Sequence, residues 1–382
     1  MKVLHLISGG DNGGAKTHLI TLLKRLRKDA SKNGVEVELL CIMHGNFTKE
    51  AEEAGIPIKI IEQKKRYSLK PILEIRNYIK SQNFDIVHCH GARANYIAIF
   101  IKNSLRLPFI TTLHSDYKLD FSDNSLKQAI FMPINAIALR QFDNILAVTN
   151  SFKEMLIQRG FKQEKIKVIY NGINMNEELN IIPKEEFLKK YNIKYSNDDI
   201  YIGIVARLQL VKGLKEFLES AKSIINNNNF SNNKNIIFLI AGNGDMEQEI
   251  KDYIINNKLE NNIKMLGFVK EIASFYNVLD INMLTSYSES FPYALLEGAR
   301  QKKATIATSV GGIPEMIRDQ KTGLLANSKS PKELEEKINY YLNNNSLINE
   351  FGESFYKDVN QNFSDKKMAE AHVEIYKNIK LN

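Results

Sequence analysis

Short apolar runs rich in Val, Ile and Leu alternate with amphipathic stretches along nearly the whole chain. In residues 15–30, for example, leucines recur on one face of a helix. Strands that are almost continuously apolar and alternate with helices are typical of a parallel sheet covered by helices on both faces. In the first half of the chain, the predicted strands are 2–8, 35–43, 56–63, 84–90, 108–115, 144–150 and 167–172.

The second half repeats this plan, with helices such as 212–225 between its strands. A polar stretch at 172–200 interrupts the rhythm of strands, and a length of 382 residues suits two domains. We therefore predict two Rossmann-like, doubly wound α/β domains with parallel sheets, at 1–175 and 176–363. The predicted strands of the second domain are 200–207, 235–245, 262–269, 280–288, 304–310 and 322–326.

Three segments do not follow this alternation of strands and helices. The asparagine-rich stretches at 225–235 and 341–346 predict loops, since folded elements flank them closely. The final segment, 364–381, has a helical pattern that begins with a suitable N-cap at Ser364.

Cysteine content and hydropathy predict a cytoplasmic protein. Cys41 and Cys89 lie in apolar runs, and their spacing suggests neither a metal site nor a disulfide framework. The chain opens without a signal-peptide pattern. The longest apolar candidate, 129–139, is broken by Pro133 and Asn135 and falls short of the ~20 residues that a membrane helix needs. Attachment to the inner face of a membrane stays open.

Charge is distributed unevenly along the chain. The net charge is +8. Residues 1–170 hold 26 Lys and Arg against 16 Asp and Glu, a net +10, and the remainder holds 26 against 28, a net −2. A basic first half favours an anionic partner, which can be nucleic acid, acidic lipid headgroups or a phosphorylated substrate. A solvated basic surface is the alternative.

Ligands of open α/β sheets bind beyond the carboxyl ends of the strands, so residues that follow strands are the candidates for a site. Gly13 and Gly14 follow the first strand and open a helix, whose free N–H groups can bind an anion. The stretch is neither a dinucleotide fingerprint nor a P-loop. His114 follows the fifth strand and suits proton exchange or hydrogen bonding. A tight turn and a structural histidine are the alternatives.

Two cations follow the first strand of the second half. Arg207 ends the predicted strand, and Lys212 opens the next predicted helix. Arg binds phosphate oxygens with a planar fork and Lys binds them as a point charge, so the two can converge on one phosphate. Two separate exposed cations are the alternative.

Two glutamates flank the start of a helix after the predicted strand 280–288. Pro292 suits a first helical turn, so the helix should begin near Phe291, with Glu289 before it and Glu297 inside it. One carboxylate can bind a sugar and the other a diol, because a carboxylate accepts two hydroxyls. The helix N-terminus between them favours a phosphate. Alternatively, Glu297 is a surface residue and Glu289 complements the helix dipole.

In order, the stretches 13–19, 112–116, 170–174, 206–214, 241–245, 289–299 and 310–317 resemble the motifs of the retaining glycosyltransferases with two facing Rossmann-like domains. This architecture is called GT-B, and the resemblance is to its "group 1", or family 4, members. The pair Glu289 and Glu297 is the most specific mark of the likeness. The family implies a cleft between the domains, with the acceptor bound by the first. It also implies that the helix 364–381 packs back on that first domain.

The resemblance implies a role for each matching residue. Glu297 would hold the ribose of a nucleotide-sugar, and Glu289 would contact the donor sugar together with backbone N–H groups near Phe291 and Pro292, although Pro292 donates none itself. Arg207 and Lys212 would neutralise the diphosphate. Gly14, with Gly13 beside it, would let the loop approach phosphate and acceptor, and His114 would contact the donor sugar.

We therefore expect a hexosyl transfer, with retention, from a UDP-sugar to a lipid-linked or cell-envelope glycan at an anionic membrane surface. The family's usual mechanism is same-face attack, in which the leaving phosphate accepts the proton. No Asp-x-Asp occurs, so we expect neither a metal nor a cofactor. A nucleotide-sugar 2-epimerase and a non-catalytic nucleotide-sugar-binding protein are the alternatives. Nucleic acid is not expected as a partner, because no aromatic-rich basic strand occurs.

Overall fold

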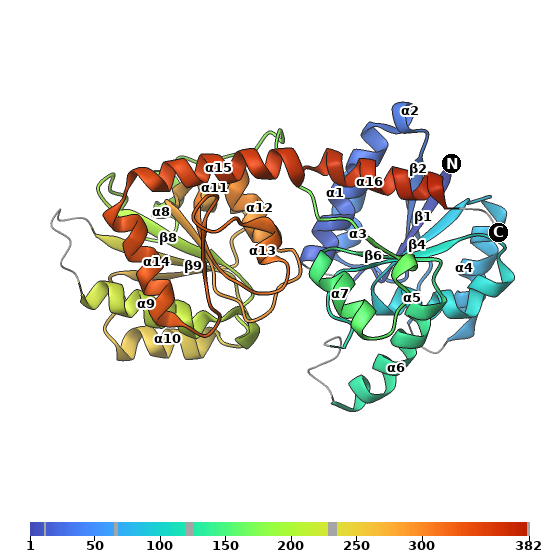
Figure 1. Cartoon of the computed structure of the whole chain (residues 1–382), viewed down its shortest axis with the longest axis horizontal. Coiled ribbons are helices and arrows are strands. Elements are labelled where there is room, and N and C mark those ends of the chain that lie inside the picture. Colours follow the sequence, from blue (N-terminus) through green and yellow to red (C-terminus); the bar gives the residue numbers. More distant parts are fainter. Residues whose placement is uncertain (11–12, 65–67, 119–124, 228–234, 380–382) are drawn as a thin grey trace. The chain divides into compact units, whose positions relative to one another are not determined.

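A computed structural model describes residues 1–10, 13–64, 68–118, 125–227 and 235–379. The chain divides into two compact units (Figure 1). Unit 1 comprises Met1–Asn174 and Phe363–Asn382, and unit 2 comprises Met175–Asn362. Among the described residues, no helix is both long and apolar enough to cross a bilayer.

Unit 1 is built on a seven-stranded parallel sheet with the strand order β3-β2-β1-β4-β5-β6-β7. Its strands are β1 (Lys2–Ile7), β2 (Glu36–Cys41), β3 (Ile58–Ile60), β4 (Ile86–His90), β5 (Phe109–Leu113), β6 (Asn144–Ala147) and β7 (Ile166–Val168). Its helices are α1 (Gly14–Lys28), α2 (Ala30–Asn33), α3 (Asn46–Glu53), α4 (Leu69–Ser81), α5 (Gly91–Ile101), α6 (Ser125–Gln141), α7 (Asn150–Gln158) and α16 (Asp365–Asn378), with short 3-10 turns at Lys102–Ser104 and Gln163–Lys165.

The core of unit 1 joins the two ends of the chain. The leucines of α1 that share one face are fully buried, and they lie in one apolar cluster with Met368, Val373 and Tyr376 of α16. Figure 1 shows α16 crossing close to α1. Because α16 belongs to this core, unit 1 is built from two separate segments of sequence.

The two crossings of the chain between the units are hydrogen-bonded to each other. The amide of Ile173 donates to the carbonyl of Phe363 (3.0 Å), and the amide of Asp365 donates to the carbonyl of Ile173 (2.9 Å). At Gly172, a Cβ would lie 2.4 Å from the carbonyl oxygen of Ser364, so only glycine permits this close approach. Ser364 also caps α16, because its hydroxyl accepts from the amide of Lys367.

Unit 2 is built on a six-stranded parallel sheet with the strand order β10-β9-β8-β11-β12-β13. Its strands are β8 (Ile200–Val205), β9 (Ile236–Ala241), β10 (Ile263–Gly267), β11 (Ile281–Leu284), β12 (Ala304–Thr308) and β13 (Leu324–Ala326). Its helices are α8 (Lys184–Lys189), α9 (Leu214–Asn226), α10 (Glu247–Asn256), α11 (Ile272–Val278), α12 (Tyr293–Arg300), α13 (Ile313–Met316), α14 (Pro331–Asn343) and α15 (Ser346–Asn362), with the 3-10 turn η3 (Leu210–Lys212).

The predicted fold class, two doubly wound parallel-sheet α/β units, is confirmed. Pro133 and Asn135, which interrupt the apolar run 129–139, lie inside α6, where a buried hydrogen bond from Asn95 to Asn135 (3.1 Å) ties α6 to α5. One local prediction is wrong. The stretch 341–346 is mostly helical, because Tyr341 and Leu342 are buried at the end of α14. Of 225–235, the structure describes α9 up to Asn226, and 228–234 lie outside the described residues.

Candidate active site

The loops after β8, β9, β11 and β12 are joined to one another at the carboxyl end of the sheet of unit 2. The amide of Leu208 donates to the carbonyl of Asn243 (3.0 Å), which joins the loops after β8 and β9. The amide of Gly312 donates to the carbonyl of Ser290 (3.0 Å), which joins the loops after β12 and β11. This is the edge at which α/β sheets bind ligands.

An ion pair between Lys212 and Glu289 lies at this edge. The Nζ of Lys212 is 2.6 Å from Oε1 of Glu289, and the side chains are only 18% and 10% exposed. Ser286 donates its hydroxyl to the same carboxylate oxygen (2.7 Å). An anion that binds here can therefore replace Glu289 as the partner of Lys212. The carboxylate of Glu289 is then free to accept hydroxyls of a ligand.

Backbone contacts hold both members of this pair in place. Lys212 ends η3 rather than opening α9, and Thr285 donates its hydroxyl to the carbonyls of Lys212 (3.1 Å) and Gly213 (2.9 Å). Behind Glu289, Gly311 has φ +54°, and a Cβ there would lie 1.7 Å from the carbonyl oxygen of Glu289. Glycine at 311 thus lets the loop after β12 close against the loop that carries Glu289.

Glu297 lies inside α12 and is half-buried rather than fully exposed. Burial raises the pKa of its carboxyl to about 7, while nearby Arg300 and a hydrogen bond with the hydroxyl of Tyr276 oppose that rise. Arg300 itself pairs with Glu177 (2.6 Å). Glu289 and Glu297 therefore have different partners.

Three other predicted residues of unit 2 lie near this edge of the sheet. Arg207 is exposed and lies two residues beyond the end of β8. Among the described residues, no hydrogen bond or ion pair joins Arg207 to Lys212 or Glu289, so its convergence on a shared phosphate stays a prediction. Phe291 is buried, and Pro292 is the N-cap residue that precedes α12.

In unit 1, the predicted residues lie at the carboxyl ends of β1 and β5. Gly13 has φ +75° and precedes Gly14, which opens α1. A Cβ at Gly13 would meet nothing within 4 Å, so the left-handed backbone rather than crowding favours glycine there. His114 directly follows β5 and is half-buried.

The sequence analysis missed a group of buried histidines around His114. Six of the seven histidines of the chain lie in contact with one another, and we call this group the histidine cluster. Its members are His5, His18, His88, His90, His114 and His372. A signal for part of it exists in the sequence: in "HCH" at 88–90, strand alternation puts both histidines on one face of the sheet. His5 is then the neighbour of His88 on β1.

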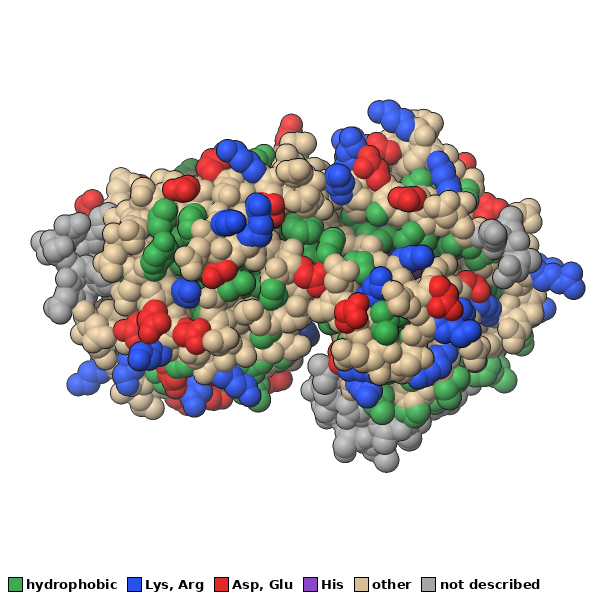
Figure 2. Space-filling model, in the orientation of Figure 1, with side chains coloured by type: hydrophobic (Ala, Val, Ile, Leu, Met, Phe, Trp, Pro, Cys, Tyr) green, Lys and Arg blue, Asp and Glu red, His purple; other side chains and the backbone are tan. Residues whose placement is uncertain are grey.

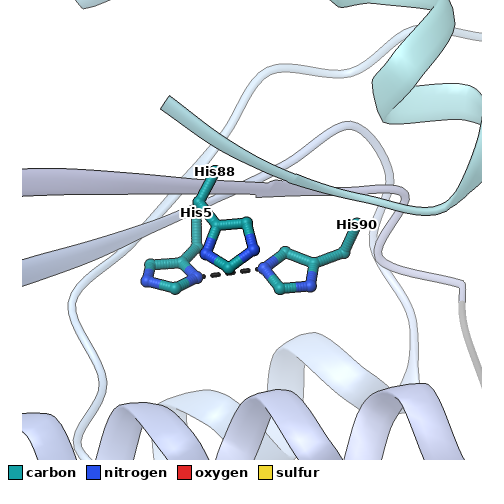
Figure 3. A group of neighbouring side chains, drawn as sticks. All are labelled: His5, His88 and His90. Carbon is teal, nitrogen blue, oxygen red and sulfur yellow. Dashed lines mark hydrogen bonds between the residues drawn. The ribbon is translucent and has the colours of Figure 1, made fainter. Parts of the chain in front are cut away.

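Hydrogen bonds connect the histidine cluster to the rest of unit 1. Nδ1 of His5 lies 3.0 Å from Nε2 of His90 (Figure 3), and Nδ1 of His90 lies 3.2 Å from Nε2 of His114. His88 bonds through Nδ1 to the hydroxyl of Tyr376 (2.8 Å) and through Nε2 to the hydroxyl of Thr112 (2.7 Å). The ring of His114 is therefore continuous with a polar network that reaches α16.

Burial keeps the histidine cluster neutral. It lowers the pKa of His18 to about 4 and that of His372 to about 3. It also lowers the pKa values of the other members well below the usual range, and the neighbouring histidines lower them further. Each imidazole thus keeps one unprotonated nitrogen at neutral pH.

Comparisons with known proteins identify the family. Residues 184–358 match the family model described as "Glycosyl transferases group 1", and residues 12–177 match the one described as "Glycosyltransferase Family 4". The chain belongs to the group 1 glycosyltransferases. The fold of this glycosyltransferase, two Rossmann-like α/β units, is of the GT-B type.

Several relatives match nearly the whole of this glycosyltransferase. An uncharacterised glycosyltransferase of Methanocaldococcus jannaschii is 28% identical over 96% of this chain and 95% of its own. The N,N'-diacetylbacillosaminyl-diphospho-undecaprenol alpha-1,3-N-acetylgalactosaminyltransferase of Campylobacter jejuni is 25% identical over 91% of this chain and 92% of its own. A solved structure from Anabaena, in complex with UDP-glucose, has a TM-score of 0.83 at 20% identity and covers 99% of this chain and 100% of its own.

Proposed function

We propose that this glycosyltransferase transfers a hexose, with retention, from a UDP-sugar to a lipid-linked or cell-envelope glycan. The observation that carries the proposal is the ion pair of Lys212 and Glu289 at the carboxyl edge of the sheet of unit 2. A diphosphate would draw Lys212 away from Glu289, and the released carboxylate would accept hydroxyls of the donor sugar. Binding of the donor would thus replace the ion pair by contacts of Lys212 with the diphosphate and of Glu289 with the sugar.

Charge development explains why this arrangement suits transfer. Breaking the bond between sugar and phosphate leaves negative charge on the diphosphate, and a half-buried lysine stabilises that charge strongly because little water competes. Arg207 would add a second cation from the loop after β8. The leaving phosphate would accept the proton of the acceptor, so Glu289 and Glu297 need not act as a base. The diphosphate would be neutralised by these side chains without a metal ion.

The choice of donor and acceptor is supported by the relatives. The Anabaena structure that shares this fold holds UDP-glucose. The Campylobacter jejuni relative acts, by its name, on a sugar linked to diphospho-undecaprenol. The net +10 of residues 1–170 would attract the acidic headgroups of the membrane that carries such an acceptor. Unit 2 has balanced charge instead, and Figure 2 shows basic and acidic side chains interspersed over the region of α9 and α10.

A transfer assay tests the whole proposal. The purified chain is incubated with UDP-, GDP- or ADP-sugars and an undecaprenyl-diphosphate-linked acceptor, in neutral or acidic vesicles, with and without EDTA. We expect product from a UDP-sugar only, unaffected by EDTA, with the faster rate in acidic vesicles at low salt and the anomer retained by NMR. Conversion of the donor in the absence of acceptor would instead indicate an epimerase. Failure of every nucleotide to raise the melting temperature would indicate a non-catalytic protein.

Nucleotide binding should depend on the ionisation of Glu297. In the folded chain, the carboxyl of Glu297 has a pKa of about 7. Only its ionised form can accept hydrogen bonds from both ribose hydroxyls. Affinity for UDP should therefore rise as pH increases, by about tenfold between pH 6 and pH 8. Calorimetric titration of UDP at both pH values measures this effect.

Variants separate Glu297 from other titrating groups. Glu297→Gln should bind UDP more weakly and lose most of the pH dependence, while Glu336→Gln, an exposed helical site in α14, should behave like the wild type. An unchanged pH dependence in Glu297→Gln would exclude Glu297 as the group that binds the ribose.

A further inference from the structure

Three members of the histidine cluster bring ring nitrogens together in unit 1. One nitrogen each from His18, His90 and His114 lies within 4.8 Å of the other two. His18 comes from α1, His90 ends β4, and His114 follows β5, so three separate elements converge on one spot. His18 and His90 are fully buried, whereas His114 is partly exposed.

The other nitrogen of two of these rings is already held. Nδ1 of His18 lies 2.9 Å from Oδ1 of Asn171, and because an amide oxygen only accepts, Nδ1 carries the proton. Nε2 of His18 is then unprotonated and carries a lone pair. This nitrogen is buried and has no hydrogen-bond partner among the described residues. Nε2 of His90 is paired with His5, and its Nδ1 faces Nε2 of His114, so a bound cation would replace only the contact between these two candidate ligands. Histidines that bind metals are typically held in this way through their second nitrogen.

The spacing of the rings fits a four-coordinate cation. Zn–N bonds of 2.0–2.1 Å in a tetrahedron put two ligand nitrogens about 3.3 Å apart and two ring centres roughly 5 Å apart. Nδ1 of His90 and Nε2 of His114 are 3.2 Å apart. The ring centres are separated by 4.8 Å for His18 and His114, 5.5 Å for His90 and His114, and 6.2 Å for His18 and His90. The ring centres of His18 and His90 are further apart than this geometry requires, so a bound cation would draw these two rings together.

We propose that His18, His90 and His114 form a binding site for Zn²⁺. Asn171 and His5 orient two of the ligands, and water would supply the fourth ligand beside the partly exposed His114. Imidazole nitrogen suits zinc and its transition-metal neighbours, whereas the Mg²⁺ or Mn²⁺ that accompany diphosphates prefer oxygen ligands. The site is thus distinct from any metal requirement of the donor.

The neighbouring triad of His5, His88 and His90 (Figure 3) suits a metal less well. Both nitrogens of His88 are already hydrogen-bonded, to Tyr376 and to Thr112. A cation there would have to break one of these bonds inside a fully buried network. We therefore infer that this triad does not bind a metal itself and instead supports the zinc site through its hydrogen bonds.

Direct binding to the metal-free, full-length chain tests the site. Calorimetric titration with Zn²⁺ should give one tight equivalent, and Co²⁺ should give the visible absorption bands of a four-coordinate ion. His114→Ala should weaken Zn²⁺ binding by at least 100-fold, and Asn171→Ala, which removes an orienting contact, by about 10- to 100-fold. The matched control is His44→Ala, since His44 is the remaining histidine and its side chain is 66% exposed, and it should bind like the wild type.

The same measurements can overturn the assignment. Absence of the cobalt bands in the wild-type chain would show that the cluster is a hydrogen-bonded network only. Equal affinity in the wild type and His114→Ala would place any bound zinc elsewhere on the surface. Circular dichroism checks that each variant is folded; if His18→Gln, a fully buried change, fails this check, the partly exposed His114→Ala still decides the outcome. No donor or acceptor enters the experiment, so its failure would leave the proposed function untouched.

Discussion

Replacing Lys212 by alanine is expected to lower the rate of sugar transfer by roughly 100- to 1,000-fold, the size typical for loss of one preorganised charge partner. Lys212 is 18% exposed and pairs with Glu289, so little water would replace its charge beside the departing diphosphate. The loss should fall mainly on kcat, because negative charge on the diphosphate grows as the bond to the sugar breaks. Steady-state kinetics with saturating acceptor measure this effect.

The matched control is Lys215→Ala, one turn further along the chain. Lys215 is exposed on α9 and lies 3.8 Å from Glu219, a surface pair that contributes little. It should keep the wild-type kcat. If Lys212→Ala stays within threefold of the wild type, Lys212 does not stabilise the leaving group, and Arg207 becomes the leading candidate for that role.

Gly311→Ala is expected to lower the free energy of unfolding by about 3–4 kcal/mol, within the range of severe single substitutions. Its φ of +54° disfavours any side chain, and a Cβ would lie 1.7 Å from the carbonyl oxygen of Glu289. The loop that carries Glu289 must therefore move or the loop after β12 must open. Urea unfolding followed by circular dichroism measures the loss, and affinity for the donor should fall with it.

Gly267→Ala separates the clash from the backbone effect. Gly267 has φ +66° in the same unit, but a Cβ there would meet nothing within 4 Å. It should cost only about 1–2 kcal/mol, the penalty of a left-handed non-glycine residue. Equal losses of unfolding free energy in the two variants would mean that the loop carrying Glu289 moves without cost to accommodate the added methyl group.

The sheets could be predicted from sequence because the pattern that builds them is local. Every predicted strand overlaps an observed one, and the ends differ by only a few residues, as with β8, which stops at Val205 rather than at Arg207. The start of α12 near Pro292 could be predicted in the same way, because proline cannot lie inside a helix without cost. The exception at Pro133 arises where packing against α5 outweighs that cost.

The partners of the site residues could not be predicted in the same way. Lys212 and Glu289 are 77 residues apart, and nothing in either stretch indicates that their charges meet. The pKa of Glu297 depends on Tyr276 and Arg300 as well as on burial, and these two residues come from another helix and from the next turn of α12. The histidine cluster depends on sheet register and on α16, so the sequence analysis described His114 as a lone residue.

The return of α16 to unit 1 has a consequence for folding during synthesis. Unit 1 lacks Tyr376 and the apolar face of α16 until residues 365–378 have left the ribosome, whereas unit 2 is one continuous segment that precedes them. At ~5–20 residues per second, the wait between the emergence of Asn174 and of Asn378 is roughly 10 to 40 s. During that time the apolar cluster around α1 lacks the residues that α16 contributes. We expect unit 2 to reach its native state first, and the early half of the chain to depend on chaperones until the late helix arrives.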